Sequence, residues 1–194
     1  MARDALRVLV INSSVRDGRF GPTAARWLLG QLADRADLTA DYLDLADHPL
    51  PLRISRQPDA DAERVLSEVT PRLERAEAFV VVTPEYNHSF PASLKNLIDW
   101  HYTQWRAKPV TFVSYGGLAG GLRSVEHLRQ VFAELHAVTT RDVVSFHNAW
   151  EQFDDNGEPV DPTGPATAAK TMLDQLAWWG FALRDARAAR PYDG

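Results

Sequence analysis

Apolar runs typical of buried strands alternate with amphipathic segments typical of helices along this chain of 194 residues. The run AFVVVT at 78–83 carries the strongest strand signal, because a parallel strand covered on both faces is apolar without alternation. Strands are expected at 6–11, 39–45, 78–83, 109–115 and 139–146, and helices at 23–36, 60–76, 91–102, 121–136 and 165–182. Such alternation favours a parallel sheet with helices on both faces. The sequence therefore predicts an α/β fold around a five-stranded parallel sheet.

Local signals refine this outline. Thr23 stands where a side chain could cap the first helix, and Pro71 is expected to kink or restart the second. Polar, proline-containing loops are expected at 46–58 and 150–165. The charged tail from Leu183 is expected to fray. With neither a linker nor an internal repeat in view, residues 1–194 are expected to form one domain.

Composition excludes several classes of protein. The chain has no cysteine, which rules out disulfides, thiolate catalysis and cysteine-ligated iron–sulfur clusters. Its six histidines lack metal-ligand spacing, so no metal site is expected. A net charge of -5 without a basic run argues against nucleic acid as a partner. There is no apolar run long enough to span a membrane and no recognisable secretory signal, so a cytoplasmic location is expected.

Ligands of doubly wound sheets bind beyond the carboxyl ends of the strands. The loop after the first strand, NSSVRDGRFGPT at 12–23, contains hydroxyls, arginines and glycines before a helix. Backbone N–H groups at a helix N-terminus suit a phosphate, and arginine adds charge-assisted hydrogen bonds. An ordinary solvated turn is equally compatible with these residues. The loop matches neither the dinucleotide glycine fingerprint nor the Walker lysine pattern.

Two further loops are expected at the same edge of the sheet. The loop TPEYNHSFP at 83–91 is stiffened by two prolines and could lay its backbone along a flat heteroaromatic ring. Tyr86 and Phe90 are also compatible with core packing, and Glu85 and His88 with simple solvent exposure. The loop SYGGLAGG at 114–121 is glycine-rich, which lets a backbone approach a ligand closely. Together the three loops indicate a binding site.

Three segments resemble the NADPH-dependent FMN reductase family. The stretch TPEYNHSFPASLKNLIDW at 83–100 is the most specific, followed by KPVTFVSYGGLAGGLR at 108–123 and the SxR motif at 14–16. The resemblance covers about residues 5–182 and implies a flavodoxin-like fold with strand order 2-1-3-4-5. Ser13 departs from the glycine that the family often has there.

The resemblance implies a binding residue set. Around the FMN phosphate it places Ser14, Arg16, Phe20, Gly21, Pro22 and Thr23; along the isoalloxazine it places Pro84, Glu85, Tyr86, Asn87, Ser114, Gly116 and Gly117. It also implies that NADPH or NADH reduces the flavin, which then reduces a small acceptor on the same face. No catalytic side chain is assigned, because the flavin carries the chemistry. The acceptor could be a free flavin, a quinone, an azo dye, a nitro compound or a metal oxyanion.

The sequence is also compatible with two other functions, and the resemblance implies an oligomer. A flavodoxin-type electron carrier would bind FMN without oxidising a nucleotide, and a fold relative without flavin would serve as an interaction module. A receiver domain is disfavoured because the third strand ends in Thr83, and no G-x-S-x-G supports a serine hydrolase. The resemblance implies a homodimer or homotetramer. Within the aromatic segment Tyr86, Phe90, Trp100, Tyr102 and Trp105, part is expected to pack on a second subunit.

Overall fold

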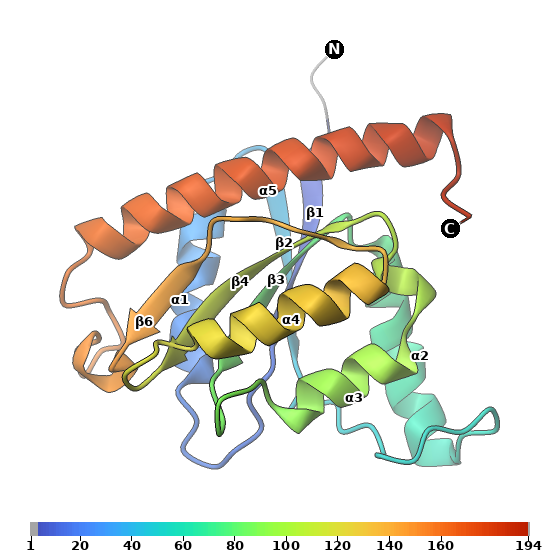
Figure 1. The fold of residues 1–194 in the computed structure, drawn as a ribbon, viewed down its shortest axis with the longest axis horizontal. Helices are drawn as coiled ribbons and strands as arrows, with labels where there is room; N and C mark the ends of the chain where they lie inside the picture. The colour runs from blue at the N-terminus through green and yellow to red at the C-terminus, as the bar shows by residue number, and fades with distance from the viewer. Residues whose placement is uncertain (1–3, 194) are drawn as a thin grey trace.

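A twisted parallel sheet forms the centre of the molecule (Figure 1). The computed structural model describes residues 4–193. The strands are β1 (Leu6–Asn12), β2 (Leu38–Asp44), β3 (Ala78–Pro84), β4 (Pro109–Gly116), β5 (Val138–Thr139) and β6 (Val144–His147). Their order is β2-β1-β3-β4-β5, with β6 also paired to β4, and the pairs are parallel. This confirms the predicted flavodoxin-like order.

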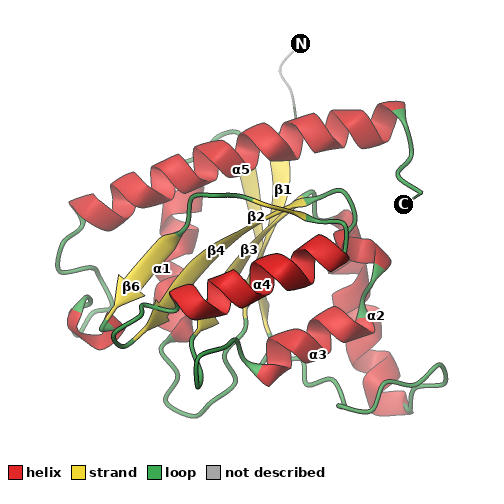
Figure 2. Cartoon of the chain, viewed as in Figure 1, coloured by secondary structure: helices red, strands yellow, loops and turns green. Residues whose placement is uncertain are grey.

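Helices cover both faces of the sheet (Figure 2). They are α1 (Gly21–Ala33), α2 (Ala60–Arg75), α3 (Ala92–Trp100), α4 (Leu122–Glu134) and α5 (Thr163–Ala189), with single turns η1 (Thr103–Trp105) and η2 (Ala149–Glu151). Val8 and Val10 of β1 pack with α1 and α5, whereas Leu9 and Ile11 pack with α2, α3 and α4. The alternation follows from successive side chains pointing to opposite faces of a strand. No helix in residues 4–193 is both long and apolar enough to cross a membrane.

The predicted last strand, 139–146, is two short strands instead of one. Between these two strands, side chains form hydrogen bonds with the backbone groups that would pair with a neighbouring strand in a continuous sheet. Arg129 Nη1 donates to the carbonyl oxygen of Thr140 at 2.5 Å, and Thr111 Oγ1 donates to that of Asp142 at 3.0 Å. Gln175 Oε1 accepts from the Asp142 N–H at 3.0 Å. These bonds replace the strand pairing and explain the break.

The structure corrects two predictions about helices near their ends. Helix α1 begins at Gly21, and Phe20 caps it without a side-chain hydrogen bond. Thr23 is therefore not the cap, and its N–H already bonds the Phe20 carbonyl inside the first turn. Helix α5 continues to Ala189, well beyond the expected end at 182. Contacts hold this last part, since the Arg187 guanidinium donates to the carbonyl of Ala107.

Pro71 does not interrupt α2. A proline removes one N–H, but the turn that follows it is held from outside the helix. Leu73 is fully buried, and Lys108 Nζ donates to the carbonyl oxygens of Leu73 and Glu74 at 2.9 and 3.0 Å. These contacts keep the helix continuous through Arg75.

Candidate functional site

The three loops chosen from the sequence meet at the carboxyl edge of the sheet. The strand register places Asn12 beside Val82 and Thr83 beside Ser114. A cavity of about 300 Å³ opens between the loops. It is lined by Arg16, Gly18, Arg19, Phe20, Pro84, Glu85, Tyr86, Tyr115, Gly116, Gly117, Ala149 and Trp150. Of the predicted residues, Ser14, Gly21, Pro22, Thr23, Asn87 and Ser114 lie outside this lining.

Arg19 closes the first loop. Its Nη1 donates to the Ser14 carbonyl oxygen at 2.7 Å and to Asp44 Oδ1 at 2.5 Å. Asp44 Oδ2 also accepts from Asn12 Nδ2 at 3.0 Å and from the Tyr42 hydroxyl at 2.8 Å. This network ties both ends of the loop to the end of β2, so the Arg19 guanidinium is committed to holding the loop.

Arg16 is available for a ligand. Its side chain is exposed, lines the cavity and forms no ion pair or hydrogen bond within residues 4–193. In the same range, the backbone N–H groups of Ser14, Arg16 and Gly21 donate to no protein acceptor. Unpaired N–H groups beside a helix N-terminus and a free guanidinium are what a phosphate requires. The remaining predicted residues here, Pro22 and Thr23, form the first turn of α1.

Gly21 lets that first turn pack closely on the first loop. A Cβ atom there would lie 2.2 Å from Ser14 Oγ, 2.3 Å from Asn12 Oδ1 and 2.9 Å from the Tyr115 hydroxyl. The Tyr115 hydroxyl is buried and makes no hydrogen bond of normal geometry within the described residues. Burial raises its pKa, so the hydroxyl keeps its proton. An unpaired polar group at this place fits a site built for a polar ligand.

The second loop is a rigid hairpin. Tyr86 and Ser89 exchange backbone hydrogen bonds of 2.8 and 3.1 Å, and Asn87 and His88 between them have φ of 49° and 74°. Two consecutive positive φ angles define a type I′ turn, which asparagine tolerates well. The side chain of Tyr86 faces the cavity, whereas Asn87 is exposed at the tip of the turn. We therefore interpret Asn87 as a turn residue in this structure.

Glu85 is held by Arg123 of α4. The guanidinium Nη1 lies 3.0 Å from Glu85 Oε1, and the Arg123 backbone N–H donates to Oε2 at 3.2 Å. Ser124 Oγ contacts the carbonyl oxygens of Pro84 and Ser89 at 2.8 and 2.7 Å. The start of α4 thus fixes the hairpin loop against the glycine-rich loop. Glu85 lines the cavity, whereas His88 lies outside the lining.

The glycine-rich loop uses its four glycines differently. Gly120 and Gly121 have φ of 58° and 83°, and Ser114 Oγ donates to the Gly120 carbonyl at 2.8 Å. These two glycines shape the loop, and Ser114 secures it. Gly117 has no positive φ, and among the described residues a Cβ there would meet the Trp150 ring alone, at 3.5 Å. Neither the backbone conformation nor the packing of the protein therefore requires a glycine at 117. The space beside Gly117 is open to a ligand.

Trp150 and Tyr115 were missed by the sequence analysis. The segment that carries Trp150 is fastened to the glycine-rich loop, because the Asn148 N–H donates to the Gly117 carbonyl at 3.0 Å. His147 Nδ1 lies 2.9 Å from the Leu118 carbonyl. The pairing of β6 with β4 places this segment beside the loop. No motif in 150–165 indicated a role for the tryptophan.

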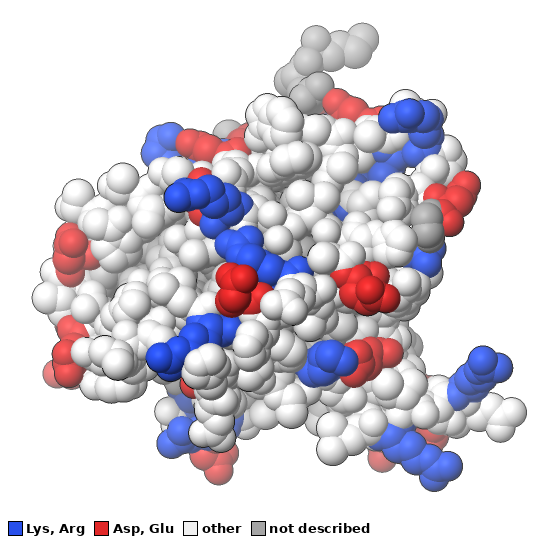
Figure 3. Space-filling model, in the orientation of Figure 1, with Lys and Arg blue, Asp and Glu red and all other residues white. Residues whose placement is uncertain are grey.

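A second cavity, of about 310 Å³, lies between α3 and the loop after β2. It is lined mainly by apolar residues such as Leu45, Leu50 and Leu97, and no arginine or lysine of residues 4–193 lines it. The cavity at the three loops therefore fits an anionic flavin better. On the face shown in Figure 3, basic and acidic side chains are interspersed and form no single basic patch.

Comparisons with known proteins identify relatives of this chain. A probable NADPH:quinone oxidoreductase 2 from Oryza sativa subsp. japonica is 30% identical over 188 residues, covering 93% of this chain and 90% of that protein. A 2-hydroxy-1,4-benzoquinone reductase from Burkholderia sp. is 30% identical over 190 residues, covering 94% and 99%. An NAD(P)H-dependent FMN reductase from Schizosaccharomyces pombe is 39% identical over 124 residues, covering 59% and 60%.

A solved structure shares the fold. FerB, a flavoenzyme NAD(P)H:(acceptor) oxidoreductase from Paracoccus denitrificans, superposes with a TM-score of 0.72 at 22% identity, covering 92% of this chain and 98% of that chain. The model of the NADPH-dependent FMN reductase family matches residues 6–151. The chain therefore belongs to the NADPH-dependent FMN reductase family, as an oxidoreductase with FMN as cofactor and NAD(P)H as co-substrate.

Proposed function

We propose that this protein transfers hydride from NAD(P)H through FMN to a quinone or another small planar acceptor. The observation that carries the proposal is the cavity itself, which joins a free arginine and a helix N-terminus to a glycine-lined slot. Two relatives that match over nearly the whole chain are named for quinone reduction. A homodimer of single-domain chains is part of the proposal.

The residues present fit FMN. Arg16 of the cavity lining would hold the phosphate, together with the unpaired N–H groups of Ser14 and Gly21, which are buried outside the lining. The backbone of Glu85 and Tyr86 on one side, and Gly117 on the other, would border the isoalloxazine. Bound FMN supplies the chemistry, accepting a hydride from the nucleotide and delivering two electrons to the acceptor. The chain itself binds and orients, and it fixes the loops through Arg19 and Arg123.

Anaerobic reduction tests the function. The purified protein loaded with FMN should lose its flavin absorbance when NADPH or NADH is added, and a quinone should then restore it. A flavodoxin-type carrier would keep its flavin oxidised under either nucleotide. A preparation that cannot be loaded with FMN would support the interaction module instead. Light scattering on the same samples tests the homodimer.

Arg16→Ala should weaken FMN binding about 10- to 100-fold. A hydrogen bond to a charged group contributes about 1.5–3 kcal/mol, and the exposed Arg16 side chain has no other partner among the described residues to retain. Fluorescence titration of the apoprotein measures the dissociation constant. Arg53→Ala, an exposed arginine outside the cavity, is the matched control. Equal affinity in the wild type and Arg16→Ala would remove Arg16 from the site.

The first loop should release FMN in acid. Burial would raise the pKa of Asp44, but hydrogen bonds from Arg19, the Ala46 N–H and Tyr42 outweigh it and lower the pKa below the ordinary 3.8. The ion pair between Arg19 and Asp44 therefore stabilises the loop above about pH 4. This stabilisation is lost as the pH falls through the lowered pKa of Asp44 in the folded protein. Flavin fluorescence should rise only below about pH 4.

Asp44→Asn is the companion variant for this pH dependence. It should lose about 1.5–3 kcal/mol of stability at neutral pH, since a charged hydrogen bond is removed. Its stability should then change less than that of the wild type between pH 5 and about pH 3. Parallel acid curves for the two proteins would show that another carboxylate controls the release.

A further inference from the structure

An exposed tryptophan stands at the mouth of the flavin cavity. Trp150 leaves 65% of its surface exposed and still lines the cavity together with Tyr86 and Gly117. Large aromatic side chains at a rim are typical of binding surfaces, because their burial by a partner is strongly favourable.

The position of Trp150 is built into the backbone. Asn148 adopts φ 45° and ψ 54°, an arrangement that non-glycine residues adopt rarely and that collects at functional sites. Ala149 is buried, so η2 is anchored in the core, and the Trp150 side chain is directed outward. Ser145 Oγ donates to the Gly120 carbonyl at 2.8 Å, which adds a further tie to the glycine-rich loop.

The ring is also near the open slot. A Cβ atom placed on Gly117 would lie 3.5 Å from Trp150 Cη2, an ordinary van der Waals contact. The tryptophan thus borders the space that the glycine leaves free. A flat acceptor that enters over the isoalloxazine bordering Gly117 would pass the indole at the mouth of the cavity, with Tyr86 also on the cavity wall.

We propose that Trp150 is a specificity-determining residue that stacks on planar aromatic acceptors and so makes bicyclic quinones preferred over acceptors without a flat ring. The proposal rests on the proposed function, since it assigns the acceptor class of the same site. It concerns acceptor binding and not the holding of FMN. Trp150 contacts the acceptor without taking part in proton or electron transfer.

The test uses menadione, a flat bicyclic quinone, and ferricyanide, an inorganic acceptor without an aromatic ring. The first measurement is the dissociation constant of menadione for the oxidised, FMN-loaded enzyme, in which no turnover occurs. Trp150→Ala should raise this constant about 10-fold, and Trp150→Phe should restore most of the affinity. In turnover, the ratio of kcat/KM for menadione to that for ferricyanide should fall about 10-fold in Trp150→Ala.

A matched control is available. Trp178 of α5 is exposed to the same extent, 65%, but lies outside the cavity lining, so Trp178→Ala should leave menadione binding unchanged. An unchanged menadione constant in Trp150→Ala would overturn the proposal. So would loss of FMN, or dissociation of an oligomer in light scattering, because Trp150 would then serve the cofactor or a subunit contact. Failure of both NADPH and NADH to reduce the wild-type flavin would instead refute the proposed function, whatever the menadione constants.

Discussion

Gly21→Ala should deprive the protein of tight FMN binding. The added Cβ would lie 2.2 Å from Ser14 Oγ and 2.3 Å from Asn12 Oδ1, distances that real Cβ atoms do not reach. Neither neighbour can yield easily. Asn12 and Ser14 are fully buried and bonded to each other, and Asn12 Nδ2 also donates to Asp44. The first turn of α1 must therefore shift away from the loop that would hold the phosphate.

Overpacking of a buried position costs about 1–3 kcal/mol. If the turn can relax only in the FMN-free protein, the FMN-bound state bears this cost. The dissociation constant of FMN is then about 10- to 100-fold higher than in the wild type. Titration of the apoprotein with FMN and with riboflavin measures it, and only FMN affinity should fall this far, since riboflavin lacks the phosphate.

Gly30→Ala is the control within the same helix. A Cβ at Gly30 would meet nothing within 4 Å, so alanine should stabilise α1 by about 0.5–1 kcal/mol through its helix propensity. FMN affinity should stay at the wild-type value in this variant. Wild-type affinity in Gly21→Ala as well would mean that the phosphate does not bind at this helix N-terminus.

The convergence of the three loops could be predicted from the sequence because topology alone decides it. Strands that alternate with helices must run parallel, and parallel strands end at the same edge. Apolar runs such as Phe79 to Val82 mark strands covered on both faces, and the structure buries them completely. The family resemblance supplied the strand order.

Side-chain roles within those loops could not be predicted. Arg16 and Arg19 are three residues apart in the same loop, and only the position of Asp44 at the end of β2 decides which of them is locked. Trp150 follows β6, whose separation from β5 depends on polar contacts made by Arg129. These choices rest on contacts between distant parts of the chain, for which the sequence contains no periodic signal.

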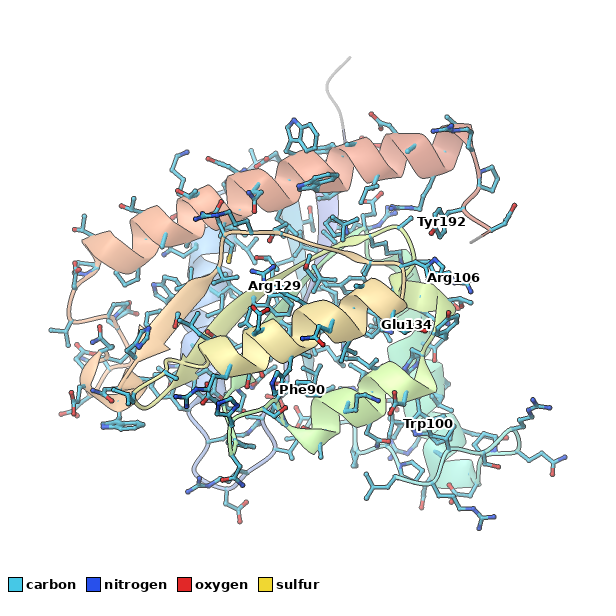
Figure 4. The ribbon with its side chains drawn as sticks, viewed as in Figure 1. Phe90, Trp100, Arg106, Arg129, Glu134 and Tyr192 are labelled. Atoms are coloured by element: carbon cyan, nitrogen blue, oxygen red, sulfur yellow. The ribbon has the colours of Figure 1, made fainter. Side chains whose placement is uncertain are left out.

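The aromatic segment shows the same limit. Part of it was expected to pack on a second subunit, but Trp105 is fully buried in this chain, between the rings of Phe79 and Phe132. Phe90 precedes α3 and Trp100 is its last residue (Figure 4), and the Trp100 Nε1 donates to the Pro51 carbonyl at 2.9 Å. The α3 helix ends at Trp100, and η1 then turns Trp105 inward. An uninterrupted helix to 102, as predicted, would not have made this turn.

Trp105→Ala should lower the free energy of unfolding by about 3–5 kcal/mol. The substitution removes an indole with no exposed surface and its Nε1 hydrogen bond to the His101 carbonyl, 2.5 Å long. A domain of this size has about 5–15 kcal/mol of stability in all, so much of it would be lost. Urea denaturation followed by far-ultraviolet circular dichroism measures the change.

Two further variants make the test decisive if Trp105→Ala fails to fold. Trp105→Phe keeps most of the ring contacts with Phe79 and Phe132 and should cost less than alanine, because it leaves a smaller cavity and one unpaired carbonyl. Tyr102→Ala removes a ring that is 46% exposed and has the Arg106 guanidinium 4.8 Å from its centroid. It should cost under about 1 kcal/mol, the value of an exposed cation–π contact. If Trp105→Phe were as stable as the wild type while its oligomer dissociated, the ring would belong to a subunit interface and the core assignment would be wrong.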